Sequence, residues 1–343
     1  MRPKKRDHPF KRSLFLAALA LGAGTAPGGA MTPPMMSVQV APGSPLRGLG
    51  SATRDGLGVY LSTRQSTRDT LRRGARDVSN PDNERSESLR TSLFLDYRLS
   101  RNFSAALSIP HLYTKGTYTD PGSGAQVTHE TNGLGDVALL GRYSVWKDRL
   151  VDPTREWLGI LGLELPTGST KEKDDNGAIL PITEQLGSDT TDIIVGTAFL
   201  WGVPHITFYG DATYKINGSR AYTFANALAL NVGANVPVAG DKLSFLGEFN
   251  GEFSGRDESD LTGAPGRNPD GTVRNTGGET IYFSPALQWR PLGYLTFTAG
   301  VQLPVHQNFR GTQLKADLNY NLGLYARFGG HGPDMMEKGE MKK

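Results

Sequence analysis

Apolar and polar side chains alternate along this chain with a period of two, in segments of about ten residues. From residue 58 onward the pattern recurs, and the 3.6-residue period of an amphipathic helix is absent. In the segment 313–328, every second residue from Leu314 to Phe328 is apolar, and the residues between are mostly charged, amide or Gly. A strand this long with one continuous apolar face needs a large apolar surface to lie against. A lipid bilayer provides one.

The same pattern predicts eleven further strands. About ten residues, tilted by about 45°, are enough for a strand to cross a bilayer. Long polar loops are predicted at 67–88, 114–133, 167–190 and 254–278, and most other connections are short. The predicted strands are 58–66, 89–99, 103–113, 134–146, 156–166, 191–201, 204–216, 222–236, 243–253, 279–290 and 294–305. We therefore predict an all-β fold, a transmembrane antiparallel up-and-down β-barrel of about 12 strands and of the outer-membrane type, over 58–328.

Two other all-β folds show similar alternation. A soluble β-sandwich has shorter strands and more uniform turns, and a solenoid needs a fixed repeat that this chain lacks. Composition excludes a helical membrane protein, because only 37% of residues are hydrophobic and no run of about 20 apolar residues occurs. The chain has no cysteine, which excludes disulfide scaffolds, thiolate metal sites and cysteine catalysis.

The first thirty residues have the features of a secretory signal peptide. Residues 1–12 carry a net charge of +5, residues 13–30 are uncharged and largely apolar, and Gly28-Gly29-Ala30 fits the small-residue cleavage rule. We expect cleavage after Ala30, an irregular periplasmic lead-in over 31–57 and a flexible C-terminal tail over 329–343. The chain after residue 30 has 31 basic and 33 acidic side chains. This slight acidic excess argues against a nucleic-acid partner.

The inward faces of the predicted strands carry charges of both signs. Such charges either form ion pairs that hold the wall together or select solutes by their charge. Apolar residues such as Phe94, Leu140 and Ile194 also face inward, which favours a weakly polar or aromatic solute. Twelve strands give a backbone diameter of roughly 23 Å and a narrow lumen. The candidate lumen-lining residues are Arg90, Asp96, Arg98, Asp136, Arg142, Glu164, Asp192, Asp211, Lys215, Glu248, Glu252, Lys315, Asp317 and Arg327.

Aromatic residues mark one rim of the predicted barrel. Trp146, Trp157, Trp201, Trp289, Tyr97 and Tyr294 lie at or beside short turns, where an aromatic girdle meets the lipid interface. Enzyme motifs are absent: the chain has no His-Glu-x-x-His, no Gly-x-Ser-x-Gly and no phosphate-binding loop. We therefore expect no catalytic residues, no cofactor and no metal site.

Three motifs resemble the outer-membrane family of meta-pathway phenol-degradation proteins. They are Asn132-Gly133-Leu134-Gly135-Asp136-Val137 with Gly141-Arg142-Tyr143, then Gly162 to Gly168, then Gly187 to Asp192 with Val195-Gly196. The resemblance extends from about residue 90 to the end and implies an outer-membrane barrel that passes small, often hydrophobic or aromatic compounds. It supplies no catalytic residues. The chain departs from the family where it continues past the final aromatic Phe328.

Together these features predict a channel in the outer membrane of a Gram-negative bacterium. It would pass small solutes by passive diffusion, and its partners would be outer-membrane lipid and the barrel-assembly machinery. One alternative stays open from the sequence: a non-transporting structural or adhesion barrel whose long extracellular loops bind partners.

Overall fold

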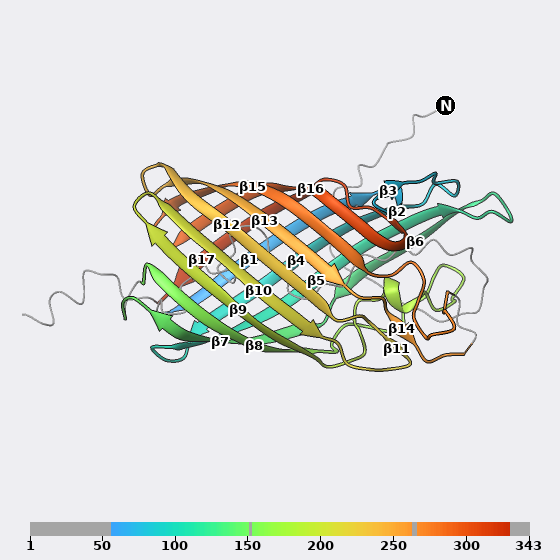
Figure 1. The fold of residues 1–343 in the computed structure, drawn as a ribbon, viewed down its shortest axis with the longest axis horizontal. Coiled ribbons are helices and arrows are strands. Elements are labelled where there is room, and N and C mark those ends of the chain that lie inside the picture. Colours follow the sequence, from blue (N-terminus) through green and yellow to red (C-terminus); the bar gives the residue numbers. More distant parts are fainter. Residues whose placement is uncertain (1–55, 151–152, 263–265, 330–343) are drawn as a thin grey trace, which may run out of the picture.

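The computed structural model describes residues 56–150, 153–262 and 266–329. The predicted signal peptide at 1–30, nearly all of the lead-in at 31–57 and the tail beyond Gly329 lie outside these residues. The described chain forms an elongated β-barrel whose strands run obliquely along its length (Figure 1). In this part of the protein, no helix is long and apolar enough to cross a membrane.

Among the described residues, twelve antiparallel strands pair in sequence order and close into a ring. The first strand, β1, completes the ring by pairing with the last, β17, from Leu57 opposite Phe328 to Ser66 opposite Asn319. This arrangement confirms the predicted up-and-down barrel. The twelve strands are β1 (Leu57–Arg68), β4 (Arg85–Arg98), β5 (Phe103–Thr119), β7 (Val137–Lys147), β8 (Arg155–Leu165), β9 (Asp192–Val203), β10 (Ile206–Ile216), β12 (Ala227–Ala239), β13 (Leu243–Ser254), β15 (Gly278–Leu292), β16 (Leu295–Leu314) and β17 (Asn319–Phe328).

The two ends of the barrel differ in their connections. The short-turn end carries the connections 99–102, 148–154, 204–205, 240–242 and 293–294, with the start of β1 and the end of β17. The long-loop end carries 69–84, 120–125, 166–191, 217–226, 255–277 and 315–318. Short strands lie within these loops: β2 (Leu71–Gly74), β3 (Arg76–Asp77), β11 (Tyr222–Thr223) and β14 (Glu258–Ser259). Connections at the two ends therefore alternate along the described chain, although their lengths overlap, since 315–318 has four residues and 148–154 has seven.

A hairpin replaces the loop predicted at 114–133. Strand β5 continues to Thr119, and β6 (Gln126–Leu134) returns beside it. The carboxylate of Asp120 shapes the turn by accepting the backbone N–H of Gly122 at 3.1 Å and the hydroxyl of Ser123 at 2.7 Å. The hairpin extends beyond the rest of the wall (Figure 1). Its side chains are mainly polar on both faces, so hydrophobic alternation gave no signal for it.

The last predicted strand, 313–328, also differs in its start. Strand β16 runs to Leu314, and β17 begins only at Asn319. Near Gly311, whose φ is +115°, the pairing of β16 shifts register so that its end lies beside β2. Positive φ favours glycine, which lets the strand bend here. Leu314 is consequently buried against Leu71 instead of facing outward.

The outer surface of the barrel is apolar. All six aromatic residues of the predicted girdle are exposed, with exposed fractions from 45% at Trp201 to 58% at Trp157. Large aliphatic side chains such as Leu161, Leu163 and Val195 are exposed on the same face. Such a surface suits contact with lipid tails and interfaces.

The inner wall holds an apolar cluster between two polar regions. Phe94, Leu140, Ile160 and Ile194 are buried there, as the alternation predicted, and the ring of Tyr60 stacks on Phe94 with centroids 5.9 Å apart. Small residues, including Ala106, Ala138 and Ala198, fill the space between these larger side chains. The interior is therefore neither uniformly polar nor uniformly apolar.

Candidate functional site

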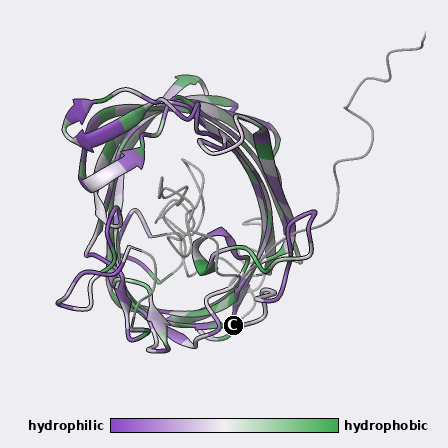
Figure 2. Cartoon of the chain, turned by 90° about the vertical axis from the view of Figure 1, so that its right-hand side faces the viewer, coloured by the Kyte–Doolittle hydropathy of each residue, from purple (hydrophilic) through white to green (hydrophobic). Residues whose placement is uncertain are grey.

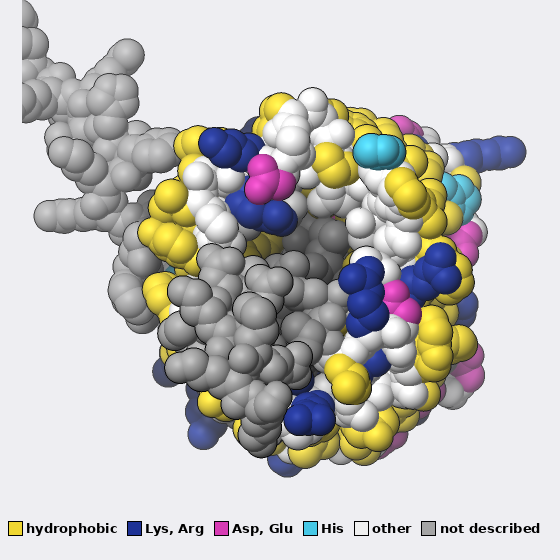
Figure 3. All heavy atoms as spheres, turned by 90° about the vertical axis from the view of Figure 1, so that its left-hand side faces the viewer, with side chains coloured by type: hydrophobic (Ala, Val, Ile, Leu, Met, Phe, Trp, Pro, Cys, Tyr) yellow, Lys and Arg dark blue, Asp and Glu magenta, His cyan; other side chains and the backbone are white. Residues whose placement is uncertain are grey.

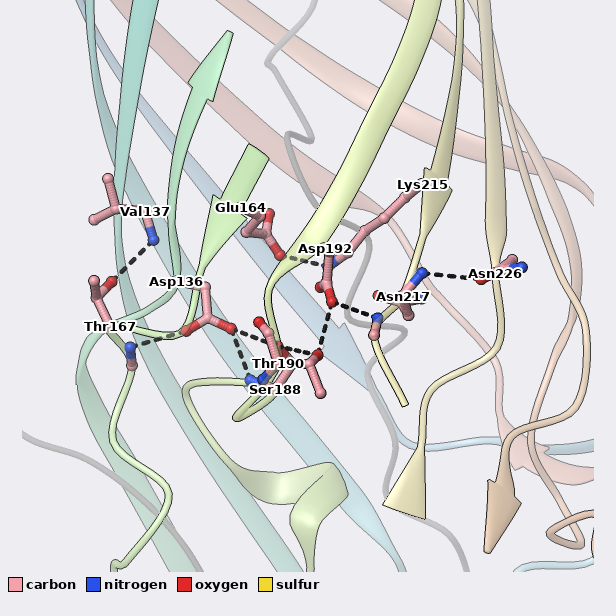
Figure 4. Close-up of polar contacts among 12 residues, drawn as sticks. Asp136, Val137, Glu164, Thr167, Ser188, Thr190, Asp192, Lys215, Asn217 and Asn226 are labelled. Carbon is pink, nitrogen blue, oxygen red and sulfur yellow. Dashed lines mark hydrogen bonds and ion pairs between the residues drawn. The ribbon is translucent and has the colours of Figure 1, made fainter. Parts of the chain in front are cut away.

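Asp136 anchors the longest ordered loop of the barrel, loop 166–191, to the wall. It lies between β6 and β7 and is buried. One carboxylate oxygen accepts the N–H of Gly168 at 2.9 Å, and the other accepts the N–H and the hydroxyl of Ser188 at 2.7 and 3.0 Å (Figure 4). The carboxylate thus ties both ends of the loop to one point. Gly168 and Gly187 permit this, because a Cβ at either would lie 2.7 Å from the backbone of the other.

A buried cation lies beside this anchor. The ammonium of Lys215 on β10 contacts the carboxylates of Glu164 on β8 and Asp192 on β9, the latter at 2.7 Å (Figure 4). Asp192 also accepts the hydroxyl of Thr190 at 2.7 Å and the N–H of Gly218 at 2.9 Å. Three neighbouring strands and two loops therefore meet at one charge cluster. Breaking such a buried pair leaves an uncompensated charge, which costs about 3–5 kcal/mol.

Loop 166–191 folds into the mouth of the barrel. Its short helix η3 (Ile182–Glu184) lies inside the outline of the barrel when the molecule is viewed from the long-loop end (Figure 2). Leu186 is buried against Leu112 of β5. Thr183 borders a cavity that is also lined by Arg68 of β1 and Gln313 of β16, on the other side of the lumen. The loop consequently narrows the long-loop mouth.

His129 and Glu184 hold the tip of the loop from one side. The Nδ1 of His129, on β6, lies 3.0 Å from a carboxylate oxygen of Glu184 on η3. The hydrogen bond to Glu184 raises the pKa of His129 above its usual 6.5, although partial burial opposes the rise. The ring of Tyr118 lies edge-on to the imidazole. The pair therefore favours the inserted position of the loop most strongly when His129 is protonated.

A second charge cluster lies near the short-turn end. A carboxylate oxygen of Asp96 on β4 accepts a hydrogen bond from the guanidinium of Arg327 on β17 at 3.1 Å. The same oxygen lies 3.7 Å from the guanidinium of Arg142 on β7. Arg142 is among the most deeply buried side chains of the described chain. Gly58 makes room for the carboxylate, since a Cβ there would lie 2.0 Å from an oxygen of Asp96. Basic side chains also lie at several points around the mouth at this end (Figure 3).

A hydrogen-bonded polar row crosses the opposite wall. The hydroxyl of Tyr209 donates to fully buried Glu248 at 2.6 Å, and Asn250 donates to the other oxygen of Glu248 at 3.1 Å. The oxygen of Asn250 accepts from Ser284 and from Gln302. Further along, Asn231 donates to Asp211 at 2.8 Å. These bonds hold the carboxylates of Glu248 and Asp211 in place on this wall.

The remaining predicted lumen residues occupy different places. Arg90 on β4 interacts electrostatically with Glu164, Asp136 and Glu252, although Glu252 belongs to β13 across the barrel. Arg98 lies at the short-turn rim, where it donates to the carbonyl of Ser100 at 2.9 Å. Lys315 and Asp317 differ from the predicted placement on the wall, since both lie in the connection between β16 and β17. Lys315 there contacts Asp77 at 2.9 Å, because β17 begins four residues later than Lys315.

Several residues of these clusters were not among the candidates. Ser188 and Thr190 belong to the third motif quoted above, so that motif was a usable signal for the loop anchor. Tyr209, Asn250 and Gln302 lie at inward positions of predicted strands, but selection by charge passed over neutral polar groups. Among the described residues, no three His, Asp or Glu side chains are grouped so as to hold a metal ion.

Comparison with known proteins gives a likeness in fold. The chain matches no family model and no curated protein sequence. Among solved structures, it resembles the COG4313 outer membrane channel from Pseudomonas putida F1, with a TM-score of 0.56 and 15% identity over 80% of this chain and 96% of that one. The translocator domain of the autotransporter NalP from Neisseria meningitidis gives a TM-score of 0.44 and 13% identity over 80% and 88%. A Pseudomonas aeruginosa FadL homologue gives a TM-score of 0.42 and 10% identity over 92% of this chain and 100% of that one. The first of these likenesses shows that the chain has the fold of an outer-membrane β-barrel.

Proposed function

We propose that the protein is an outer-membrane channel that passes small solutes by passive diffusion through a narrow lumen. The observation that carries the proposal is the inverted polarity of the barrel. Its large apolar side chains are exposed on the outside, and most of its deeply buried charged and amide side chains line the inside. A closed wall of this kind suits lipid outside and polar solutes inside.

The lining of the lumen favours the passage of small solutes of low polarity. The two charge clusters pair cations with carboxylates, and the apolar patch around Phe94 and Ile160 lies on the same inner wall. Loop 166–191 narrows the mouth further. The motif resemblance to phenol-degradation proteins supports aromatic compounds in particular. No catalytic group is assigned.

Localisation and partners belong to the same proposal. Residues 1–30 direct export and are removed near Ala30, and the barrel-assembly machinery inserts the barrel among outer-membrane lipids of a Gram-negative bacterium. The barrel occupies 58–328, preceded by a periplasmic lead-in and followed by a tail. The support is the basic and apolar order of the first 30 residues together with the barrel fold.

Two measurements on the folded, purified protein test the channel. In planar bilayers it should give discrete conductance steps smaller than those of 16- to 18-stranded porins. In a liposome-swelling assay, phenol-sized neutral compounds should permeate faster than disaccharides. Equal permeation of both would remove the preference for aromatic solutes. A folded but silent barrel would reject the channel, and would favour a barrel whose long loops bind outside partners.

A further inference from the structure

Exposed aromatic side chains gather on the outer face of β7, β8 and β9 near the short-turn end. Trp157 on β8 lies directly opposite Trp146 on β7 and, on its other side, directly opposite Phe199 on β9. Trp201 follows two residues after Phe199, on the same face of β9. The exposed fraction of these side chains runs from 40% at Phe199 to 58% at Trp157. These residues form one aromatic patch at the end of the barrel where a lipid interface is expected.

Arg155 lies at the edge of the aromatic patch. It is the first residue of β8 and lies directly opposite Trp201. Its guanidinium carbon is 4.4 Å from the centroid of the Trp201 ring, which is a cation–π contact. Because Arg155 comes two residues before Trp157 on a tilted strand, it lies about 5 Å closer to the aqueous end of the barrel. A cation is therefore held on an aromatic ring just outside the apolar band.

The guanidinium of Arg155 has no carboxylate partner in the described part of the chain. Asp148 accepts the backbone N–H of Arg155 at 3.1 Å, but its ion pair is with Arg149 at 3.7 Å. Glu156 is buried on the inner face of β8, whereas Arg155 is exposed on the outer face. A guanidinium carries five N–H donors along its edge, and stacking on an indole uses only its face. The edge is consequently open to an acceptor from the surroundings.

A lipid phosphate matches this arrangement. Two phosphate oxygens can accept parallel N–H bonds from one guanidinium, and the bonds are strong because both partners are charged. The indole N–H of Trp157 donates to the hydroxyl of Thr197 at 2.6 Å, so this ring presents a fixed apolar surface to an acyl chain. A headgroup with a net negative charge fits better than a zwitterionic one, whose own ammonium offsets the phosphate charge.

We infer that Arg155 and the aromatic patch form a binding site for an anionic phospholipid. The phosphate bonds to the edge of the Arg155 guanidinium, and one acyl chain lies over Trp157 and Trp146. Trp201 is a positioning residue, since it holds the guanidinium at the headgroup level. The inference rests on the proposed location in the outer membrane and names the class of lipid bound at the short-turn end.

Direct lipid binding tests the site without relying on transport. Native mass spectrometry of the full folded chain in detergent measures the affinity of the first bound lipid, for phosphatidylglycerol and phosphatidylcholine with the same acyl chains. Phosphatidylglycerol should bind about tenfold more tightly, the effect expected for one charge-assisted interaction. Arg155→Gln should remove this preference. Equal affinity of the unaltered chain for the two lipids would overturn the inference.

Variants of Trp201 test how the cation is held. Trp201→Leu removes the ring face and should weaken phosphatidylglycerol binding by about two- to fivefold while leaving phosphatidylcholine binding unchanged. Trp201→Tyr keeps an aromatic face and should lose less. Equal losses in the two variants would show that the ring face does not position Arg155, and would overturn that role.

A matched control removes another exposed cation at the same end of the barrel. Lys242 lies in the turn 240–242 between β12 and β13. Lys242→Gln should leave the lipid preference unchanged, and a loss equal to that of Arg155→Gln would show general charge attraction and overturn the site. Flotation with phosphatidylcholine vesicles then separates the two proposals. A folded chain that does not insert rejects the membrane location, whereas insertion with equal lipid affinities rejects the site alone.

Discussion

Replacing Asp136 by Asn should release loop 166–191 from the barrel mouth while leaving the barrel folded. The Asp136 carboxylate accepts three hydrogen bonds, at 2.9, 2.7 and 3.0 Å, from Gly168 and Ser188 at the two ends of the loop. An amide removes the charge from all three bonds and replaces one accepting oxygen by an NH₂ group, which faces another donor. Charge-assisted bonds contribute about 1.5–3 kcal/mol each and neutral ones about 0.5–1.5. The closed position should therefore lose about 2–4 kcal/mol, because the bonds do not add independently.

A loss of this size is easily measured by limited proteolysis. Trypsin cleaves after lysine, and the loop exposes two lysines, Lys171 and Lys173. If cleavage proceeds from the released loop, a loss of 2 kcal/mol raises the cleavage rate about 30-fold and a loss of 4 kcal/mol raises it several hundred-fold. The folded barrel should keep its heat-dependent gel mobility, since the ring of strands does not depend on this carboxylate.

The control removes a carboxylate from the same loop without removing the anchor. Asp175 is exposed, and Asp175→Asn should change the cleavage rate by less than about threefold. A cleavage rate for Asp136→Asn that equals that of Asp175→Asn would refute the idea that Asp136 holds the loop. Cleavage of both variants throughout the barrel would instead show that the wall itself had loosened.

Three further predictions concern the cluster around Asp96 and the pair of His129 with Glu184. Gly58→Ala places a methyl group where the Asp96 carboxylate lies and should lower the midpoint of denaturation in lipid, whereas Gly293→Ala, with no atom within 4 Å, should not. Arg142→Met leaves buried Asp96 with one cation fewer and should cost about 3–5 kcal/mol in the free energy of unfolding, and an unchanged denaturant midpoint would contradict this. The pKa of His129 is raised, so its pairing with Glu184 is fully present below its usual 6.5 and is lost as the pH rises through the raised value. Loop cleavage, taken relative to His129→Gln at the same pH, should therefore be slowest near pH 6 and should rise towards the variant's rate near pH 9. A constant ratio would rule out the pairing as a pH-dependent contact.

The barrel could be predicted because lipid imposes a rule on every strand. Each outward residue must be apolar, so a period of two extends over ten or more residues and gives the strand positions to within a few residues. Where that rule ends, the prediction fails. The β5–β6 hairpin has polar side chains on both faces, and the bend near Gly311 turns Leu314 inward, so neither follows the alternation.

The charge clusters could be predicted only as a set of residues. Alternation placed Glu164, Asp192 and Lys215 on the inner face, but their contact depends on the register between β8, β9 and β10. Asp136 was expected on the wall, and its role as a loop anchor needs the positions of Gly168 and Ser188. Sequence spacing carries no information on how far a loop folds into the mouth. The cavity under Thr183 therefore had no signal in the sequence.

The pairing of β1 with β17 has a consequence for the order in which the protein folds. Its ten residue pairs join positions roughly 260 residues apart, and no strand can be left out of the ring between them. Bringing the two ends of so long a chain together costs about 5 kcal/mol of conformational entropy by the simple logarithmic relation for loops. Until they meet, both strands present unpaired backbone groups, each costing several kcal/mol in lipid. Closure is therefore a late and all-or-none step, and a chain that lacks β17 should stay open and unfold, without forming a smaller barrel.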